Sequence, residues 1–226
     1  MTATLHTIPL GMVNCFVLDG EQTILIDAGV SGQMDRFLEG LKAANIELTK
    51  IDLLLFTHSH MDHTGLAKEI LELSQAQTAC HVLEKDYLES GKSPHPRGTN
   101  AAGKFVAGLM NFMPQSGGSP IKVDIAFGDE DFSLAVYGIP GRVIYTPGHT
   151  LGSVSVLLDS GEAIVGDLAM NAMSLRRKPG LPIFAEDVAL VKASWQKLLD
   201  AGAKTIYPSH GQPFSAEVWG QLLGTR

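Results

Sequence analysis

The segment at residues 53–65, LLLFTHSHMDHTG, constrains the fold of this chain more than any other segment. Its apolar start is typical of a buried strand. The run then stops, and four side chains that can bind a metal ion follow at once: His58, His60, Asp62 and His63. Burying four such groups beside a core without partners would cost much free energy. The segment therefore predicts a buried strand that ends in a metal site.

The spacing of these four residues indicates more than one metal ion. Alternate side chains of extended backbone point the same way, so His58, His60 and Asp62 are expected to begin on one side of the chain. His63 is one step out of phase and faces a second direction. Two directions from one loop suit two metal ions better than one.

Other expected strands also end in a residue that can bind a metal ion. Each of these residues follows an apolar stretch and lies beside glycine, proline or both, which is typical of a tight functional loop. They are Asp27, His149, Asp167 and His210. Several such ends in one chain predict a common edge at which the loops converge.

Strands and helices are expected in both halves of the chain. The segments expected to contain strands are 13–20, 22–29, 51–57, 78–83, 121–127, 132–138, 141–148, 152–159, 162–167 and 204–211. The segments expected to be helical are 32–44, 66–75, 84–90, 101–113 and 187–201. This order favours a layered α/β or α+β sandwich over a helix bundle or a β-barrel. We expect a single domain that spans residues 1–226.

Composition and charge exclude several function classes. The net charge is −7, which is unlike the basic footprint of a nucleic-acid-binding protein, so no nucleic-acid partner is expected. The two cysteines, Cys15 and Cys80, are far apart and predict no disulfide framework. No apolar run reaches the length of a membrane span, and the first residues lack a secretory signal. The expectation is a cytoplasmic protein without a membrane partner.

Five short motifs carry a resemblance to a known family. They are LIDAG, THSHMDH, TPGHTLGS, VGD and YPSHG, and they extend from residue 25 to residue 211. In this order they resemble the metallo-β-lactamase superfamily. The resemblance implies a four-layer αββα fold, in which two mixed β-sheets pack face to face, helices flank both, and a metal site lies at one edge.

The resemblance also assigns the ligands of two metal ions. The first ion is expected to be held by His58, His60 and His149. The second is expected to be held by Asp62, His63 and His210. Asp167 is expected to bridge the two ions. Asp27 is expected either to orient a ligand histidine or to cap a turn.

The site predicts a hydrolase that needs two divalent metal ions, zinc first, with iron or manganese as alternatives. Two such ions can share a hydroxide that attacks a small-molecule ester, thioester or lactone, with Asp62 as the catalytic carboxylate. One alternative is an oxidoreductase similar to the persulfide dioxygenases, with a single iron on His58, His149 and Asp167. Another is a metal-containing binding or sensor protein without turnover.

The substrate-binding residues are harder to predict. Residues 91–120 are interpreted as a lid over the metal edge, an ordinary packed helix or a homodimer contact. The apolar residues that would line a pocket there are Phe105, Leu109, Met110, Phe112 and Met113. Met170 either lines the same pocket or belongs to the core. Arg176 and Arg177 either bind an anionic group of the substrate or lie in a solvated loop.

Overall fold

The computed structural model of the chain describes residues 3–110, 118–171 and 178–225, and the side chains of these residues except that of Met110. Two mixed sheets of six strands form its centre. The first sheet has the order β1-β2-β3-β4-β5-β6. Its strands are β1 (Thr4–Pro9), β2 (Asn14–Asp19), β3 (Thr23–Ile26), β4 (Ile51–Leu55), β5 (Gln77–His81) and β6 (Ile125–Phe127). From β3 onward the neighbours are parallel, which places the ends of β3, β4 and β5 at one edge.

The second sheet has the order β12-β11-β10-β9-β8-β7. Its strands are β7 (Phe132–Ser133), β8 (Gly141–Tyr145), β9 (Val154–Leu158), β10 (Glu162–Ile164), β11 (Thr205–Tyr207) and β12 (Phe214–Ser215). Because β9 is antiparallel to both β8 and β10, and β11 is parallel to β10, three strands run in one direction. The carboxyl ends of β8, β10 and β11 therefore meet at one edge.

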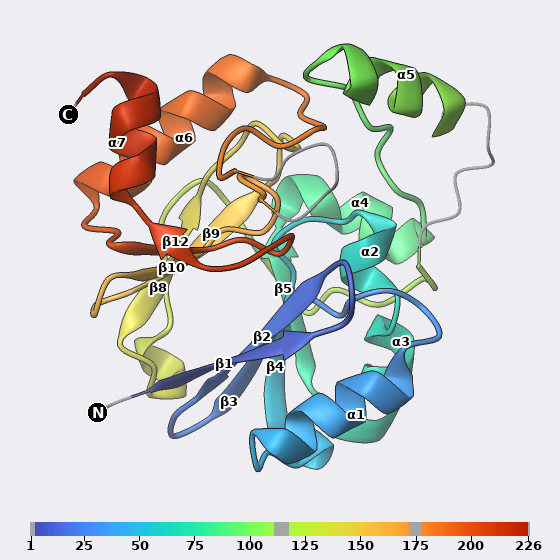
Figure 1. Ribbon diagram of the computed structural model, residues 1–226. Helices are drawn as coiled ribbons and strands as arrows, with labels where there is room; N and C mark the ends of the chain where they lie inside the picture. Colours follow the sequence, from blue (N-terminus) through green and yellow to red (C-terminus); the bar gives the residue numbers. More distant parts are fainter. Residues whose placement is uncertain (1–2, 111–117, 172–177, 226) are drawn as a thin grey trace.

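Helices cover the outer faces of both sheets (Figure 1). The helices α1 (Met34–Ala43), α3 (Ala67–Ser74) and α4 (Val82–Ser90) pack on the first sheet, and α6 (Val188–Asp200) and α7 (Glu217–Leu223) pack on the second. A short helix, α2 (Met61–Thr64), follows β4. Within the described ranges, no helix is both long and apolar enough to cross a membrane. The predicted αββα architecture is confirmed.

Alternation along the strands produces three apolar layers. In β2, Phe16 and Leu18 face the second sheet, whereas Cys15 and Val17 face the helices. Strands β3 and β4 divide in the same way, so both faces of the first sheet are buried. A sheet that is covered on both faces needs continuous apolar strands. This requirement explains why the run that precedes His58 contains no alternating polar residue.

The structure corrects three sequence expectations about strands. β1 pairs with β2 over its whole length and was not predicted. The segment 132–138 forms only the two residues of β7, and a 3₁₀ turn follows at Ala135–Tyr137. The strand expected at 121–127 is limited to β6. Edge strands have a ladder partner on one side only and are often short, and their patterns are correspondingly weak.

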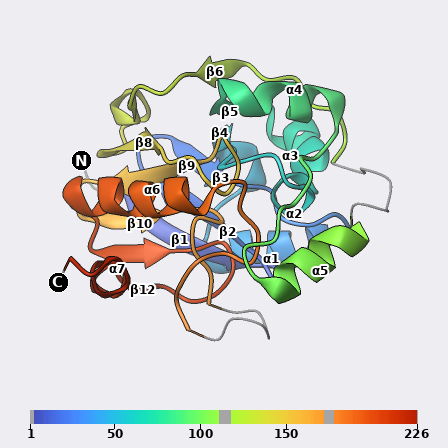
Figure 2. The ribbon, with the colours of Figure 1, turned by 90° about the horizontal axis from the view of Figure 1, so that it is seen from above.

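The helix expected at 101–113, within the predicted lid segment, is described over Ala101–Met110 as α5. Figures 1 and 2 both show α5 at the periphery of the molecule. The stretch that precedes it is tied to the second half of the chain: Ala185 N–H donates to the Arg97 carbonyl at 2.8 Å, and Thr99 N–H donates to the Ile183 carbonyl at 2.9 Å. The lid, packing and dimer interpretations of residues 91–120 all stay predictions.

Burial makes both thiols unreactive, which gives a first testable prediction. Cys15 and Cys80 are fully buried. Burial, followed by the charge of Asp27, raises the pKa of Cys15 well above its ordinary value. Burial, followed by the charge of Glu84, raises the pKa of Cys80 to about 12. Because only the thiolate reacts, the native chain should show almost no labelling by a disulfide reagent at about pH 8, and two thiols per chain in denaturant. Fast labelling of the native chain would contradict this packing.

Candidate metal centre

The ligand loop after β4 changes from extended to helical backbone at His60. His60 itself is extended, with a ψ of 150°, and α2 begins at the next residue. The expected alternation of side chains therefore ends at His60, and Asp62 and His63 lie on a helical turn instead. This turn is fixed to the loop after β3: Ala28 N–H donates to the His63 carbonyl at 2.6 Å, and Gly65 N–H donates to the Gly29 carbonyl at 2.7 Å.

Gly65 shows how closely α2 approaches that loop. A Cβ atom at this position would lie 2.2 Å from the backbone nitrogen of Ser31. Only glycine fits such a contact. The close approach brings the α2 ligands to the carboxyl end of β3.

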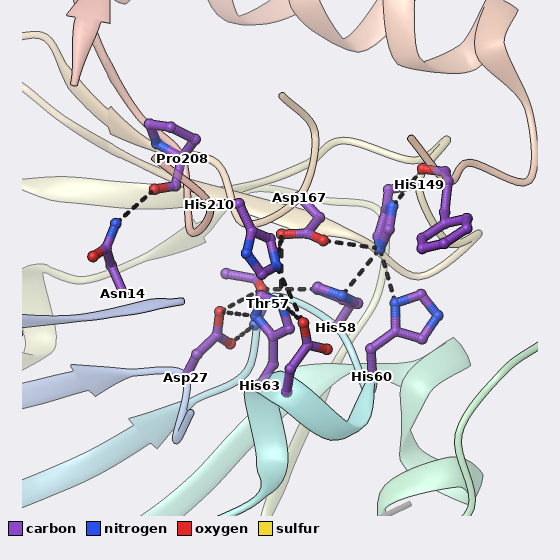
Figure 3. A network of polar contacts seen from close by, with 12 residues as sticks. Asn14, Asp27, Thr57, His58, His60, His63, His149, Asp167, Pro208 and His210 are labelled. Carbon is purple, nitrogen blue, oxygen red and sulfur yellow. Dashed lines mark hydrogen bonds and ion pairs between the residues drawn. The ribbon is translucent and has the colours of Figure 1, made fainter. Parts of the chain in front are cut away.

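The first expected half-site is a group of three imidazoles (Figure 3). His149, from the loop after β8, places its Nε2 3.1 Å from Nε2 of His58 and 2.9 Å from Nδ1 of His60. His58 and His149 are fully buried, and His60 is half-buried. The three nitrogens are close enough to share one metal ion.

The second expected half-site combines one carboxylate with two imidazoles. Nε2 of His210, from the loop after β11, lies 3.1 Å from Oδ2 of Asp62. Nε2 of His63 lies 3.9 Å from the same oxygen. These three atoms also lie within reach of a single metal ion.

Asp167, which follows β10, lies between the two half-sites (Figure 3). Its Oδ2 lies 3.7 Å from Nε2 of His149. Its Oδ1 lies 3.4 Å from Nε2 of both His63 and His210. One carboxylate oxygen thus faces each half-site, which is the arrangement that a bridging ligand requires.

Asp27 determines which ring nitrogen carries the proton in two histidines. Nδ1–H of His63 donates to Oδ2 of Asp27 at 2.8 Å, because a carboxylate can only accept. The hydroxyl of Thr57 donates to the same oxygen at 2.7 Å, so its own oxygen accepts from Nδ1–H of His58 at 3.0 Å. Thr57 N–H donates to Oδ1 at 2.8 Å. Asp27 therefore contacts the ligand loop rather than its own turn.

Main-chain carbonyls do the same for His149 and His210, whereas the fifth histidine, His60, turns its Nδ1 toward His149. Nδ1–H of His149 donates to the carbonyl of Phe184 at 2.9 Å. Nδ1–H of His210 donates to the carbonyl of Met12 at 2.6 Å. In neutral form, all four rings consequently present an Nε2 lone pair to the centre of the site.

These converging lone pairs fit a bound cation. Two of them, on His58 and His149, lie 3.1 Å apart with no proton to share. Nε2 of His63 and Oδ1 of Asp167 are buried without a hydrogen-bond partner. Such orphaned acceptors repel one another unless a positive charge lies among them. Imidazole nitrogens together with carboxylate oxygens are ligands of zinc and related divalent ions.

In the first half-site, the pKa shifts of His58 and His60 keep these two rings neutral. Burial, and then the neighbouring imidazoles, hold the pKa of His58 well below its ordinary value. Burial, and then His149, lower the pKa of His60 to about 3. A neutral imidazole is the form that binds a metal ion, so these two rings can bind one at neutral pH.

The second half-site has the opposite electrostatic character. Burial acts to lower the pKa of His63, but Asp27, Asp62 and Asp167 outweigh burial and raise it well above its ordinary value. For His210, burial also acts to lower the pKa, but Asp167 and Asp62 outweigh burial and raise the pKa to about 10. The field of these carboxylates favours positive charge here, whether a proton or a metal ion carries it.

The structure thus brings together the seven predicted ligands. Of the predicted substrate-binding residues, only Phe105, Leu109 and Met170 have described side chains. Phe105 and Leu109 lie on α5 and are 77% and 63% exposed. Met170 is fully buried, and its backbone pairs with His210 and Gly180. The backbone of Met110 ends α5. Phe112, Met113, Arg176 and Arg177 lie outside the described residues.

Sequence reasoning named Asp27 as one group that could orient a ligand histidine, but it missed the other groups that support the ligands. Thr57 had a usable signal, because a polar residue ends an apolar strand directly before the first ligand. The carbonyls of Met12 and Phe184 had none, because every residue has a carbonyl. Glu84 accepts a hydrogen bond from Ser59, which lies between the ligands His58 and His60. Because Glu84 and Ser59 are 25 residues apart in the chain, nothing in the sequence indicates this contact.

The fold and the site define a histidine–carboxylate metal centre at the edge of an αββα sandwich. The metallo-beta-lactamase superfamily model matches residues 8–210. The chain belongs to the metallo-β-lactamase superfamily. Within this superfamily, relatives that are described as metallo-hydrolases support hydrolase activity in general.

Individual relatives agree with this family. The metallo-beta-lactamase fold-containing protein ST1585 of Sulfurisphaera tokodaii is 30% identical over 97% of this chain and 82% of its own length. Its counterpart among solved structures, ST1585 from Sulfolobus tokodaii, has a TM-score of 0.67 at 26% identity and covers 98% of this chain and 85% of its own. The probable metallo-hydrolase MJ0888 of Methanocaldococcus jannaschii is 31% identical over 68% of this chain and 66% of its own length.

One more distant relative has a more specific name. The atrochrysone carboxyl ACP thioesterase of Aspergillus fumigatus is 25% identical over 88% of this chain. The chain spans half the length of that relative.

Replacing Asp27 tests the hydrogen-bond network under the site. In Asp27→Asn the buried side chain loses its charge and one of the two oxygens that accept from Thr57 and His63, so the metal-free chain should lose about 1–3 kcal/mol of unfolding free energy. Asp35→Asn, at an exposed carboxylate on α1, should change it by less than about 0.5 kcal/mol. Urea denaturation followed by circular dichroism measures both. Equal midpoints for Asp27→Asn and the unsubstituted chain would show that this network contributes nothing.

Proposed function

We propose that the chain is a hydrolase with a dinuclear metal centre that cleaves a small-molecule carboxylic ester, thioester or lactone. The observation that carries the proposal is the pair of half-sites on either side of Asp167, with four histidine Nε2 lone pairs directed inward. When bound, two divalent ions supply an activated water and polarise the substrate carbonyl. Zinc is the expected metal, since imidazole and carboxylate ligands suit it.

The protein's own residues perform separate tasks in this scheme. His58, His60 and His149 hold the first ion, and Asp167 directs one oxygen to each side. Asp62 differs from Asp167 in exposure, since its side chain is 36% exposed and that of Asp167 is 7% exposed. Water and substrate therefore reach the site beside Asp62.

Asp62 is also in the ionised form, which accepts hydrogen bonds through both oxygens. Burial opposes its charge, but His63 and the hydrogen bond with His210 hold the pKa of Asp62 well below its ordinary value. The carboxylate is consequently ionised at neutral pH. At the open side of the site it can orient the attacking water by accepting a hydrogen bond from it.

Two observations support an ester-like substrate with an apolar part. The thioesterase relative provides the first. The second is a set of exposed apolar side chains beside the ligands: Met12, Met61 and Leu151 are 72%, 45% and 49% exposed. Met12 also supplies the carbonyl that orients His210. Such side chains suit contacts to an apolar acyl or leaving group.

Metal content distinguishes this proposal from its alternatives. Chain purified without a chelator or a metal-binding tag should contain about two divalent ions per chain, measured by elemental analysis, because a group of possible ligands lies on each side of Asp167. Removing the ions should abolish hydrolysis of aryl esters and thioesters, and adding zinc should restore it. A single iron with oxygen consumption on a persulfide would instead support the oxidoreductase.

A substitution at Asp62 tests the catalytic role. Asp62→Asn should lower kcat for thioester or ester hydrolysis by about 10²–10⁴-fold, since it removes a charged ligand and the carboxylate proposed to orient the attacking water. Asp86→Asn, at an exposed position on α4, should leave kcat unchanged. Full hydrolysis by Asp62→Asn would contradict the role, and metal binding without any hydrolysis in the unsubstituted chain would favour a binding or sensor protein.

A further inference from the structure

Glu84 is a buried carboxylate that none of the chemistry above uses. It lies in the first turn of α4 and is 2% exposed. Its position in the chain, between the two metal-binding motifs, gave no indication of a link to either. In the structure it receives hydrogen bonds from both of the loops that supply the first half-site.

The two oxygens of Glu84 are divided between these loops. Oε2 accepts from the backbone N–H of Ser59 at 3.0 Å and from the Ser59 hydroxyl. Oε1 accepts from the hydroxyl of Thr150 at 2.6 Å and from the backbone N–H of Gly152 at 3.1 Å. Ser59 lies between His58 and His60, and Thr150 follows His149 directly. One side chain is therefore hydrogen-bonded to both loops.

The start of α4, which carries Glu84, has anchoring contacts of its own. His81, the N-cap of α4, accepts from Leu83 N–H through Nδ1 at 3.3 Å and lies 3.1 Å from Asp129 through Nε2. The N-terminal end of a helix favours the negative charge of Glu84. The four donors to Glu84 are all uncharged, so its charge is balanced by directed hydrogen bonds.

Gly152 shows that the approach is close. A Cβ atom at this position would lie 2.5 Å from Oε1 of Glu84. Tyr145 fixes the same loop from the other side, because its hydroxyl donates to the carbonyl of Leu151 at 2.8 Å, and its ring stacks on His81 with centroids 4.5 Å apart. The loop that follows His149 is thus tied to the start of α4 at two points.

We propose that Glu84 is a positioning residue that sets the spacing of the His58–His60 loop and the His149 loop, and thereby the metal affinity of the first half-site alone. The inference rests on the proposed function, because it assigns this group of imidazoles to a metal ion. The second half-site has different supports, namely Asp27 for His63 and the Met12 carbonyl for His210. Its affinity should therefore not depend on Glu84.

Glu84→Gln is the direct test. The amide keeps the size of the carboxylate, but its NH₂ must face either the two donors of Ser59 or those of Thr150 and Gly152. The probe is Co²⁺ alone, added to the full metal-free chain in competition with a chromophoric chelator. We expect one of the two equivalents to bind at least about tenfold more weakly, and the other to stay within about threefold of the unsubstituted chain. The visible Co²⁺ spectrum of the weakened equivalent should also change.

Asp86→Asn, an exposed substitution on the same helix, is the matched control and should bind both equivalents normally. Two results would overturn the proposal: Glu84→Gln binding both equivalents with unchanged affinity, or both equivalents weakening to the same extent. Ser59→Ala removes one hydroxyl donor and replaces Glu84→Gln if that variant lacks a native near-ultraviolet circular dichroism spectrum. The same two criteria then apply to Ser59→Ala.

The proposed function can fail separately. An unsubstituted chain that binds two Co²⁺ ions and shows the selective effect of Glu84→Gln, but hydrolyses no ester or thioester after loading with zinc, would support the positioning role and contradict the hydrolase. Conversely, a loaded chain that hydrolyses esters and binds Co²⁺ without dependence on Glu84 would support the hydrolase and contradict the positioning role.

Discussion

The rest of the site depends on the hydrogen bonds that the carboxylate of Asp27 accepts from Thr57 and His63. Asp27 follows β3 with a φ of +60°, a left-handed conformation that aspartate tolerates better than most residues. This turn directs a fully buried carboxylate toward the end of the neighbouring strand β4, where it accepts from Thr57 and His63. Through Thr57 it also fixes the ring of His58. A buried charge with several donors is costly to disturb, so the loop after β4 has little freedom.

Two buried carboxylates divide the support of the site between them. Asp27, at the end of β3, accepts a hydrogen bond from the ring of His63. Glu84, on α4, accepts one from the backbone N–H of Ser59, which lies between His58 and His60. Neither carboxylate pairs with a lysine or arginine in the contacts described above. Both are balanced by N–H and O–H groups that belong to the ligand loops themselves. A displaced ligand loop would therefore leave a buried carboxylate without its donors, which costs free energy. The burial of these two charges thus restricts the positions of the loops.

The clustering of the seven candidate ligands was predictable because each follows an apolar strand, where an unexplained polar residue is rare. The central strands were predictable from their continuous apolar runs. Helices such as α1 and α6 were predictable from apolar residues at helical spacing. The turn at Met61–Thr64 was not, because the extended pattern of residues 58–62 fits the sequence equally well and the contact with Gly29 decides between the two. Main-chain acceptors such as the carbonyl of Met12, 198 residues from His210, have no signature in residue type.

Each half-site takes its ligands from loops of both sheets. His58 and His149 are 91 residues apart in the chain, and Asp62 and His210 are 148 residues apart. An ion held in either half-site would act as a crosslink between the two sheets, comparable to a disulfide that closes a very long loop. Such a crosslink forms only after both sheets have docked, so it contributes to the lifetime of the native state rather than to the first steps of folding. Loss of either sheet would release the ion, and the two halves of the sandwich would then unfold as one cooperative unit.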